Sequence, residues 1–186
     1  MPDIMSFTSI ILLADIVIFT IYDTYVLVRF GIPANLSITY YAFERRKKRA
    51  GLLFPALMLL LCGTALPIWI STTYYASSWG SKFVVFPVTT LICLIAVAAS
   101  ARYKRLPKLI YFHYTCAIIA AACAVAWVIL VAYKILFITL GFLSLLVYMG
   151  IHTNTLKKCT LFWLENAAFY SILFTLLLIH MIPVRI

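Results

Sequence analysis

Three of the five acidic residues in this 186-residue sequence lie inside long apolar segments. They are Asp15, Asp23 and Glu165, and His113 is a fourth titratable side chain in such a segment. A charged side chain at the centre of a membrane helix costs roughly 2.5–3.5 kcal/mol on insertion scales, so it usually faces other helices and often marks function. These residue types suit the binding or relay of protons, cations or a small polar solute.

The depths of these side chains predict a common layer. At about 1.5 Å per residue, Asp23, His113 and Glu165 lie roughly 10, 6 and 8 Å inside the ends of their segments. We therefore expect them near one face of the membrane, with Asp15 reaching its middle. The candidate binding site comprises Asp15, Tyr22, Asp23, His113, Glu165 and Asn166.

Three interpretations of this layer remain open, and a small channel or transporter is the favoured one. An intramembrane hydrolase with a metal on Asp23, His113 and Glu165 is the second, although no HxxxH or ExxH pair pre-positions two ligands. The third is a non-catalytic protein that binds lipids or partners, with the buried acids serving helix packing. No nucleotide-binding or hydrolase motif occurs, so we expect no cofactor and favour a non-enzymatic function.

The elements that must position these residues are membrane helices. Hydrophobic residues make up 66% of the chain, charged residues 11%, and the mean hydropathy is +1.09. The apolar segments exceed the roughly 10 residues of a barrel strand, so an all-α polytopic membrane protein is predicted. We expect one domain, residues 1–186, that forms a six-helix transmembrane bundle. The predicted spans are 7–30, 52–71, 83–101, 109–132, 135–151 and 160–182.

The boundary between the fourth and fifth predicted spans is the weakest. Residues 109–151 contain no proline, and Tyr133-Lys134 is the only polar break near their middle. We expect a tight helical hairpin there. A five-span protein with one long, broken helix is the alternative.

Lysine and arginine counts predict the orientation. Twelve basic residues fall in the first, third and fifth loops, against Lys82, Lys134 and Arg185 on the other side. Basic loops face the cytoplasm, so both termini are expected outside. A bacterial inner membrane is the expected location.

A basic cluster immediately precedes the second predicted span. It consists of Arg45, Arg46, Lys47, Lys48 and Arg49. Such a cluster anchors the topology or attracts anionic lipid headgroups, at about 1 kcal/mol per basic residue. Membrane lipids are thus the expected partners. Nucleic acid is not expected as a partner, because no recognisable nucleic-acid-binding fold accompanies the basic residues. Separately, the small residues of the fourth predicted span would suit a homo-oligomer contact.

Hydroxyl-bearing residues precede this cluster. Pro33 ends or kinks the first span, after which Asn35 or Ser37 would cap a helix that runs through the basic cluster into the second span. Alternatively, this stretch dips into the bundle and lines its cytoplasmic mouth. The residues concerned are Ser37, Thr39, Tyr40 and Tyr41.

Overall fold

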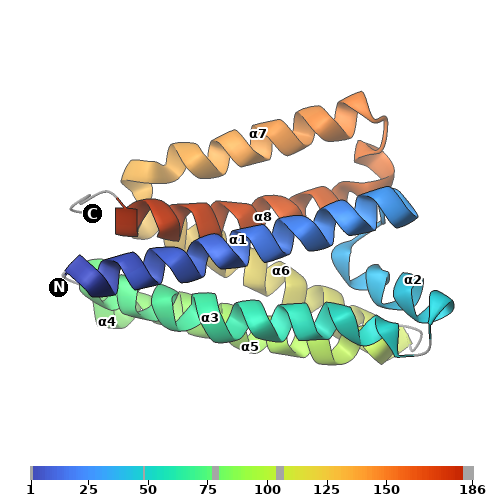
Figure 1. The fold of residues 1–186 in the computed structure, drawn as a ribbon, viewed down its shortest axis with the longest axis horizontal. Helices are drawn as coiled ribbons and strands as arrows, with labels where there is room; N and C mark the ends of the chain where they lie inside the picture. The colour runs from blue at the N-terminus through green and yellow to red at the C-terminus, as the bar shows by residue number, and fades with distance from the viewer. Residues whose placement is uncertain (1, 48, 77–79, 104–106, 182–186) are drawn as a thin grey trace.

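The computed structural model describes residues 2–47, 49–76, 80–103 and 107–181, and its regular elements in these ranges are all helical. Figure 1 shows a bundle of long helices with both described chain ends at one end of it. The α-helices are α1 (Pro2–Phe30), α2 (Thr39–Arg46), α3 (Leu53–Ala76), α4 (Gly80–Phe83), α5 (Val85–Ser100), α6 (Pro107–Leu130), α7 (Leu136–His152) and α8 (Leu156–Met181). Short 3-10 helices connect them: η1 (Leu36–Ile38), η2 (Ala50–Leu52), η3 (Ala101–Tyr103) and η4 (Tyr133–Ile135).

Five apolar stretches are long enough to cross a membrane. They are Phe7–Phe30, Ala50–Tyr75, Lys108–Leu130, Tyr133–His152 and Leu156–Met181. At about 1.5 Å per residue, each covers or exceeds a hydrocarbon core of about 30 Å. Helix α5 is equally apolar but has only 16 residues and follows the short helix α4. The sixth crossing therefore stays a prediction.

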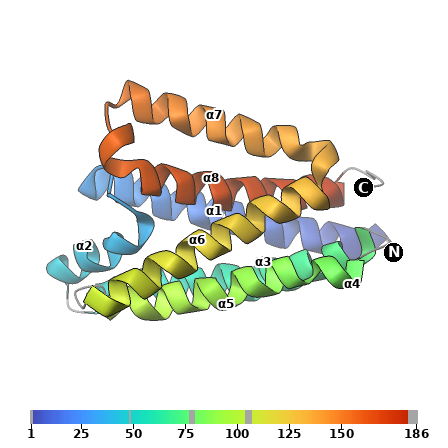
Figure 2. The same cartoon turned by 180° about the vertical axis from the view of Figure 1, so that it is seen from behind.

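Helices α1, α3, α5, α6 and α8 enclose the interior of the bundle, and α7 lies outside it against α8 (Figures 1 and 2). Buried side chains form two clusters, one towards each end of the bundle. Phe19 packs on the rings of Phe169 and Tyr170 in the first cluster, and Trp69 meets Trp127 edge to face in the second. Such aromatic contacts fix which faces of neighbouring helices meet.

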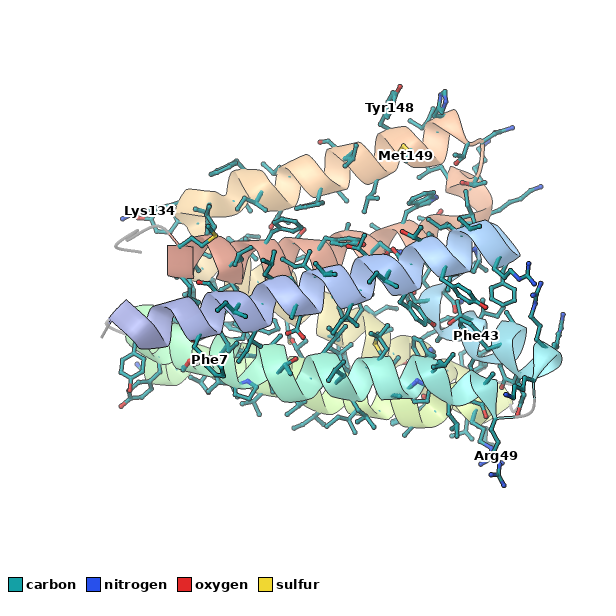
Figure 3. All side chains as sticks on the ribbon, viewed as in Figure 1. Phe7, Phe43, Arg49, Lys134, Tyr148 and Met149 are labelled. Carbon is teal, nitrogen blue, oxygen red and sulfur yellow. The ribbon has the colours of Figure 1, made fainter. Side chains whose placement is uncertain are left out.

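The chain reverses between α6 and α7. Helix α6 ends at Leu130, and the polar pair Tyr133-Lys134 begins η4. Helix α7 then runs back along α8 with little of its surface covered by protein. Tyr148 points away from the bundle (Figure 3). Most of α7 is therefore available to lipid.

The prediction of one helix running from Asn35 through the basic cluster into the second span is wrong. Helix α2 stops at Arg46, Lys47 is extended (φ −145°), and Arg49 is left-handed (φ 76°). Consecutive cations repel one another along a helix, whereas basic residues in a last turn interact favourably with its carbonyl end. The turn also needs Gly51, because a Cβ there would lie 2.7 Å from the Tyr40 carbonyl oxygen.

The described basic residues of this cluster are exposed at one end of the bundle. Figure 3 shows Arg49 at that end and Lys134 at the other. Arg45, Arg46, Lys47 and Arg49 are all exposed, and the Arg46 guanidinium lies 5.0 Å from the centre of the Phe30 ring. Lys48 lies outside the described residues.

Candidate functional site

The segment between α1 and α2 enters the bundle and forms the centre of the candidate site. Asn35, Ser37 and Thr39 are 3%, 1% and 0% exposed. The Asn35 Oδ1 accepts hydrogen bonds from the Ile38 N–H (2.9 Å) and the Ser37 hydroxyl (2.8 Å), which caps η1. A polar segment can be buried only where such partners replace water, and Asn35 supplies two of these bonds locally.

His113 fixes this segment to the α5–α6 hairpin. Its Nε2 lies 2.8 Å from the Ser37 Oγ, and its Nδ1 lies 2.8 Å from the Ser100 Oγ. Since the Ser37 hydrogen is donated to Asn35, the Nε2 must carry the proton that joins His113 to Ser37. The imidazole is 1% exposed and bridges the inserted segment and the end of α5.

Glu165 fixes the same segment to α8. Its Oε2 accepts a hydrogen bond of 2.7 Å from the Leu36 N–H, and the side chain is partly buried. Helix α8 bends at Cys159 (φ −125°, ψ 27°), and the Phe162 N–H bonds to the Ala34 carbonyl at 3.2 Å. The bend therefore lets α8 hold the segment through backbone as well as side chain.

Two tyrosines complete the attachment. Tyr22 on α1 forms a hydroxyl–hydroxyl bond with Thr39, whose own hydroxyl donates to the Leu36 carbonyl at 2.6 Å. Tyr41 donates to the Arg102 carbonyl at 2.8 Å. Tyr40 is buried, which raises the pKa of its hydroxyl, and the nearby Glu44 carboxylate acts in the same direction.

The structure thus brings together some of the predicted site residues and separates others. Tyr22, His113 and Glu165 each contact the Leu36–Thr39 stretch, which includes Ser37 and Thr39 of the possible mouth lining. Asp15 lies elsewhere, at the α1–α3 interface. The Thr64 hydroxyl lies 2.9 and 2.8 Å from its two carboxylate oxygens.

Asp23 and Asn166 are buried apart from this network, at 7% and 1% exposure. Among the residues that the structure describes, the Oδ1 of each has no hydrogen-bond partner. The Asn166 amide nitrogen donates to the Phe162 carbonyl on its own helix at 3.0 Å.

A cavity of about 110 Å³ begins at the inserted segment and continues between the helices. Its polar side chains are Ser37, Thr90 and Glu165, and the rest of its lining is apolar apart from Cys62 and the indole N–H of Trp69. It extends along α3 from Phe54 to Trp69 and reaches Ala121 on α6, an exposed residue. The cavity is therefore polar at one end and opens beside α6.

Ser100, Thr64 and Thr90 are the polar residues of these contacts that the sequence analysis missed. Each is a hydroxyl side chain in a mostly apolar helix, and its only signal is that it lies at the depth of a predicted partner. In the described ranges no three His, Cys, Asp or Glu side chains come close enough to hold a metal ion.

No family model, curated protein or solved structure matches this chain. Function is therefore inferred from the geometry alone.

Proposed function

We propose that this protein binds a single-chain amphiphile inside the membrane. Its polar head would lie at Ser37 and Glu165, and its hydrocarbon tail would follow the cavity towards Trp69. The observation that carries this proposal is the cavity itself, which is polar at one end and almost wholly apolar along its length. Ligand sites of this kind combine an apolar wall with a few polar groups that fix orientation.

The dimensions of the cavity favour a chain over a bulky ligand. Phe54 and Trp69, which line its two ends, are separated by fifteen residues of α3, or about 22 Å at ~1.5 Å per residue. The volume of about 110 Å³ corresponds to only a few methylene groups, so a bound chain would have to widen the cavity along this length. Because Ala121 is exposed, the chain would enter sideways from the lipid.

The polar end selects the chemistry of the head. Glu165 accepts hydrogen bonds when ionised, and none of the described residues that line the cavity is a lysine or arginine. An acidic head would meet the like charge of the Glu165 carboxylate. We therefore expect a head that donates hydrogen bonds, such as an alcohol or an amine.

The channel or transporter predicted from the sequence is retained as the second candidate. Transport of protons, ions or a polar solute requires a pathway lined by polar groups, and the buried Asp15 and Asp23 favour it. The apolar cavity wall favours an amphiphile instead. An intramembrane metal hydrolase has no such observation in its favour, because it needs a set of metal ligands.

The orientation is proposed on charge. The end with Arg49 would face the cytoplasm, with α4 and α5 together providing a sixth crossing and both termini outside. The exposed basic residues would then lie among anionic headgroups, as in a bacterial inner membrane.

The binding test uses a long-chain alcohol brominated near its far end, because bromine quenches tryptophan fluorescence on contact. Protein in lipid nanodiscs should show saturable quenching that Trp69→Phe greatly reduces. Ala117→Leu narrows the cavity next to its polar end and should weaken binding about tenfold, or ~1.4 kcal/mol. Ala122→Leu adds the same side chain to an exposed position outside the cavity lining, so it should bind like the parent.

Quenching that does not saturate, or that is equal in the Ala117→Leu and Ala122→Leu variants, would contradict an internal site. Equal binding of a brominated fatty acid would contradict the selection by Glu165. Flux in liposomes separates the second candidate. Proton or ion flux above that of empty liposomes, lost on Asp23→Asn, would favour transport.

A further inference from the structure

The α1 and α8 helices, which pack together, each carry a buried side-chain oxygen that has no hydrogen-bond partner among the described residues. Phe19 and Thr20 are the α1 residues that contact α8 here. The Phe19 ring lies 5.0 Å from that of Tyr170 and 5.1 Å from that of Phe169, and Tyr170 donates a hydrogen bond of 3.2 Å to Thr20. The two helices run in opposite directions (Figure 1).

The next turn of each helix carries a polar residue on this same face. Asp23 follows Thr20 by three residues and Phe19 by four. Asn166 precedes Phe169 by three and Tyr170 by four. Residues three and four apart share a helix face, and the next turn of each antiparallel helix lies at the same level. This spacing places Asp23 and Asn166 at the same level on the facing sides of α1 and α8.

Both of these residues present an acceptor atom without a donor. The Asp23 Oδ1 and the Asn166 Oδ1 are buried and unpartnered among the described residues. The Asn166 amide cannot readily turn round, because its nitrogen already donates to the Phe162 carbonyl at 3.0 Å. Two acceptors cannot bond to each other, so this interface needs one hydrogen more than the deprotonated side chains provide.

We propose that Asp23 and Asn166 form a proton-binding site, in which a neutral Asp23 donates its O–H to the Asn166 Oδ1. One proton taken from water satisfies both atoms and removes a negative charge from the interior. Its release would return a carboxylate that faces an amide oxygen. Helix α8 contributes to both this site and the amphiphile cavity, but neither Asp23 nor Asn166 lines the cavity, and the proposal does not depend on it.

Among the residues that the structure describes, the groups around Asp23 provide no compensating cation. The Tyr22 and Tyr170 hydroxyls are near enough to interact with it electrostatically. On α8, Glu165 is bonded to Leu36 instead. Helix α2 packs on α1 through Phe43, and its charged residues Glu44, Arg45 and Arg46 are exposed, as is Arg29 on α1. On α3 the titratable groups of the membrane interior are thiols and phenols, such as Cys62.

Infrared spectroscopy tests the protonation state directly. At neutral pH, the spectrum of the parent minus that of Asp23→Asn should contain the C=O stretch of a carboxylic acid. In the Asn166→Leu background the same band should move to higher frequency, because its hydrogen bond is lost. A carboxylate band in place of the acid band would overturn the proposal. A carboxylate band that shifts with sodium concentration would assign the site to a metal cation instead.

Unfolding in SDS provides a second measurement. An asparagine at position 23 can donate its amide hydrogen to the Asn166 Oδ1, so Asp23→Asn should unfold at the same SDS fraction as the parent. Asp23→Leu and Asn166→Leu should unfold at lower SDS fractions. If Asp23→Asn is as unstable as Asp23→Leu, a donated hydrogen is not what this interface requires, and the proposal fails.

Discussion

The bond between Glu165 and the Leu36 N–H should control how firmly the inserted segment is held. Leu36 is 2% exposed, so its N–H has no water to replace a lost acceptor. Hydrogen bonds to charged groups contribute about 1.5–3 kcal/mol and neutral ones about 0.5–1.5 kcal/mol. Glu165→Gln keeps an acceptor and should cost about 1 kcal/mol. Glu165→Leu leaves a buried N–H unpaired and should cost about 3 kcal/mol.

Limited trypsin digestion in detergent measures this local loss. Cleavage after the exposed Arg45, Lys47 and Arg49 requires the segment to open, so its rate follows the open population when reclosing is fast. At ~1.4 kcal/mol per factor of ten, we expect rates about 5-fold higher in Glu165→Gln and about 100-fold higher in Glu165→Leu. Cleavage after Lys134, at the opposite end, is the internal reference and should not change.

Two results would refute this reasoning. Equal cleavage rates in Glu165→Gln and Glu165→Leu would mean that the hydrogen-bond acceptor kept by glutamine does not stabilise the segment. A parallel increase at Lys134 would mean that the whole bundle is loosened and that Glu165 does not act locally.

Two further predictions concern packing, and SDS-induced unfolding checks both. Thr64→Val should lower the unfolding free energy by about 1–3 kcal/mol, because the buried carboxylate of Asp15 loses its donor. Thr64→Ser keeps a hydroxyl and should recover most of that loss. Equal unfolding free energies for the two variants would contradict a hydrogen-bond effect. Gly51→Ala should destabilise the protein, since its Cβ would lie 2.7 Å from the Tyr40 carbonyl oxygen. The Cβ of Gly63→Ala meets nothing within 4 Å, so that variant should be neutral or stabilising by up to about 1 kcal/mol. A loss of stability at Gly63 as large as that at Gly51 would be inconsistent with the close contact.

The membrane class could be predicted from the sequence because lipid imposes long apolar helices. The first span, predicted as 7–30, coincides with the apolar stretch Phe7–Phe30, since Pro33 and Gly31 stop a helix by local backbone rules. The path of the basic cluster could not be predicted. It depends on how η2 packs against Tyr40, a contact with no local signal in the sequence.

The site shows the same division between local and long-range effects. The depth of a residue in the membrane follows from counting residues along its helix. This count predicts that His113 and Glu165 lie near the same layer. Which side each one faces depends on the crossing of helices distant in the sequence. Asp15 therefore contacts Thr64 on α3, and Asp23 makes no hydrogen bond to the inserted segment among the described residues, although the sequence predicts both in one shared site.

The inserted segment has a consequence for biosynthesis. Ser37 and Leu36 leave the ribosome before their partners exist, because His113 and Glu165 follow 76 and 129 residues later. Until α6 and α8 arrive, the Leu36 N–H and the Ser37 oxygen lack these partners and can bond only to water, the translocon or headgroups. The connection between the first two predicted spans must therefore be among the last parts of the protein to adopt its final position. A nascent chain that stops before α8 would keep this polar stretch at the membrane surface.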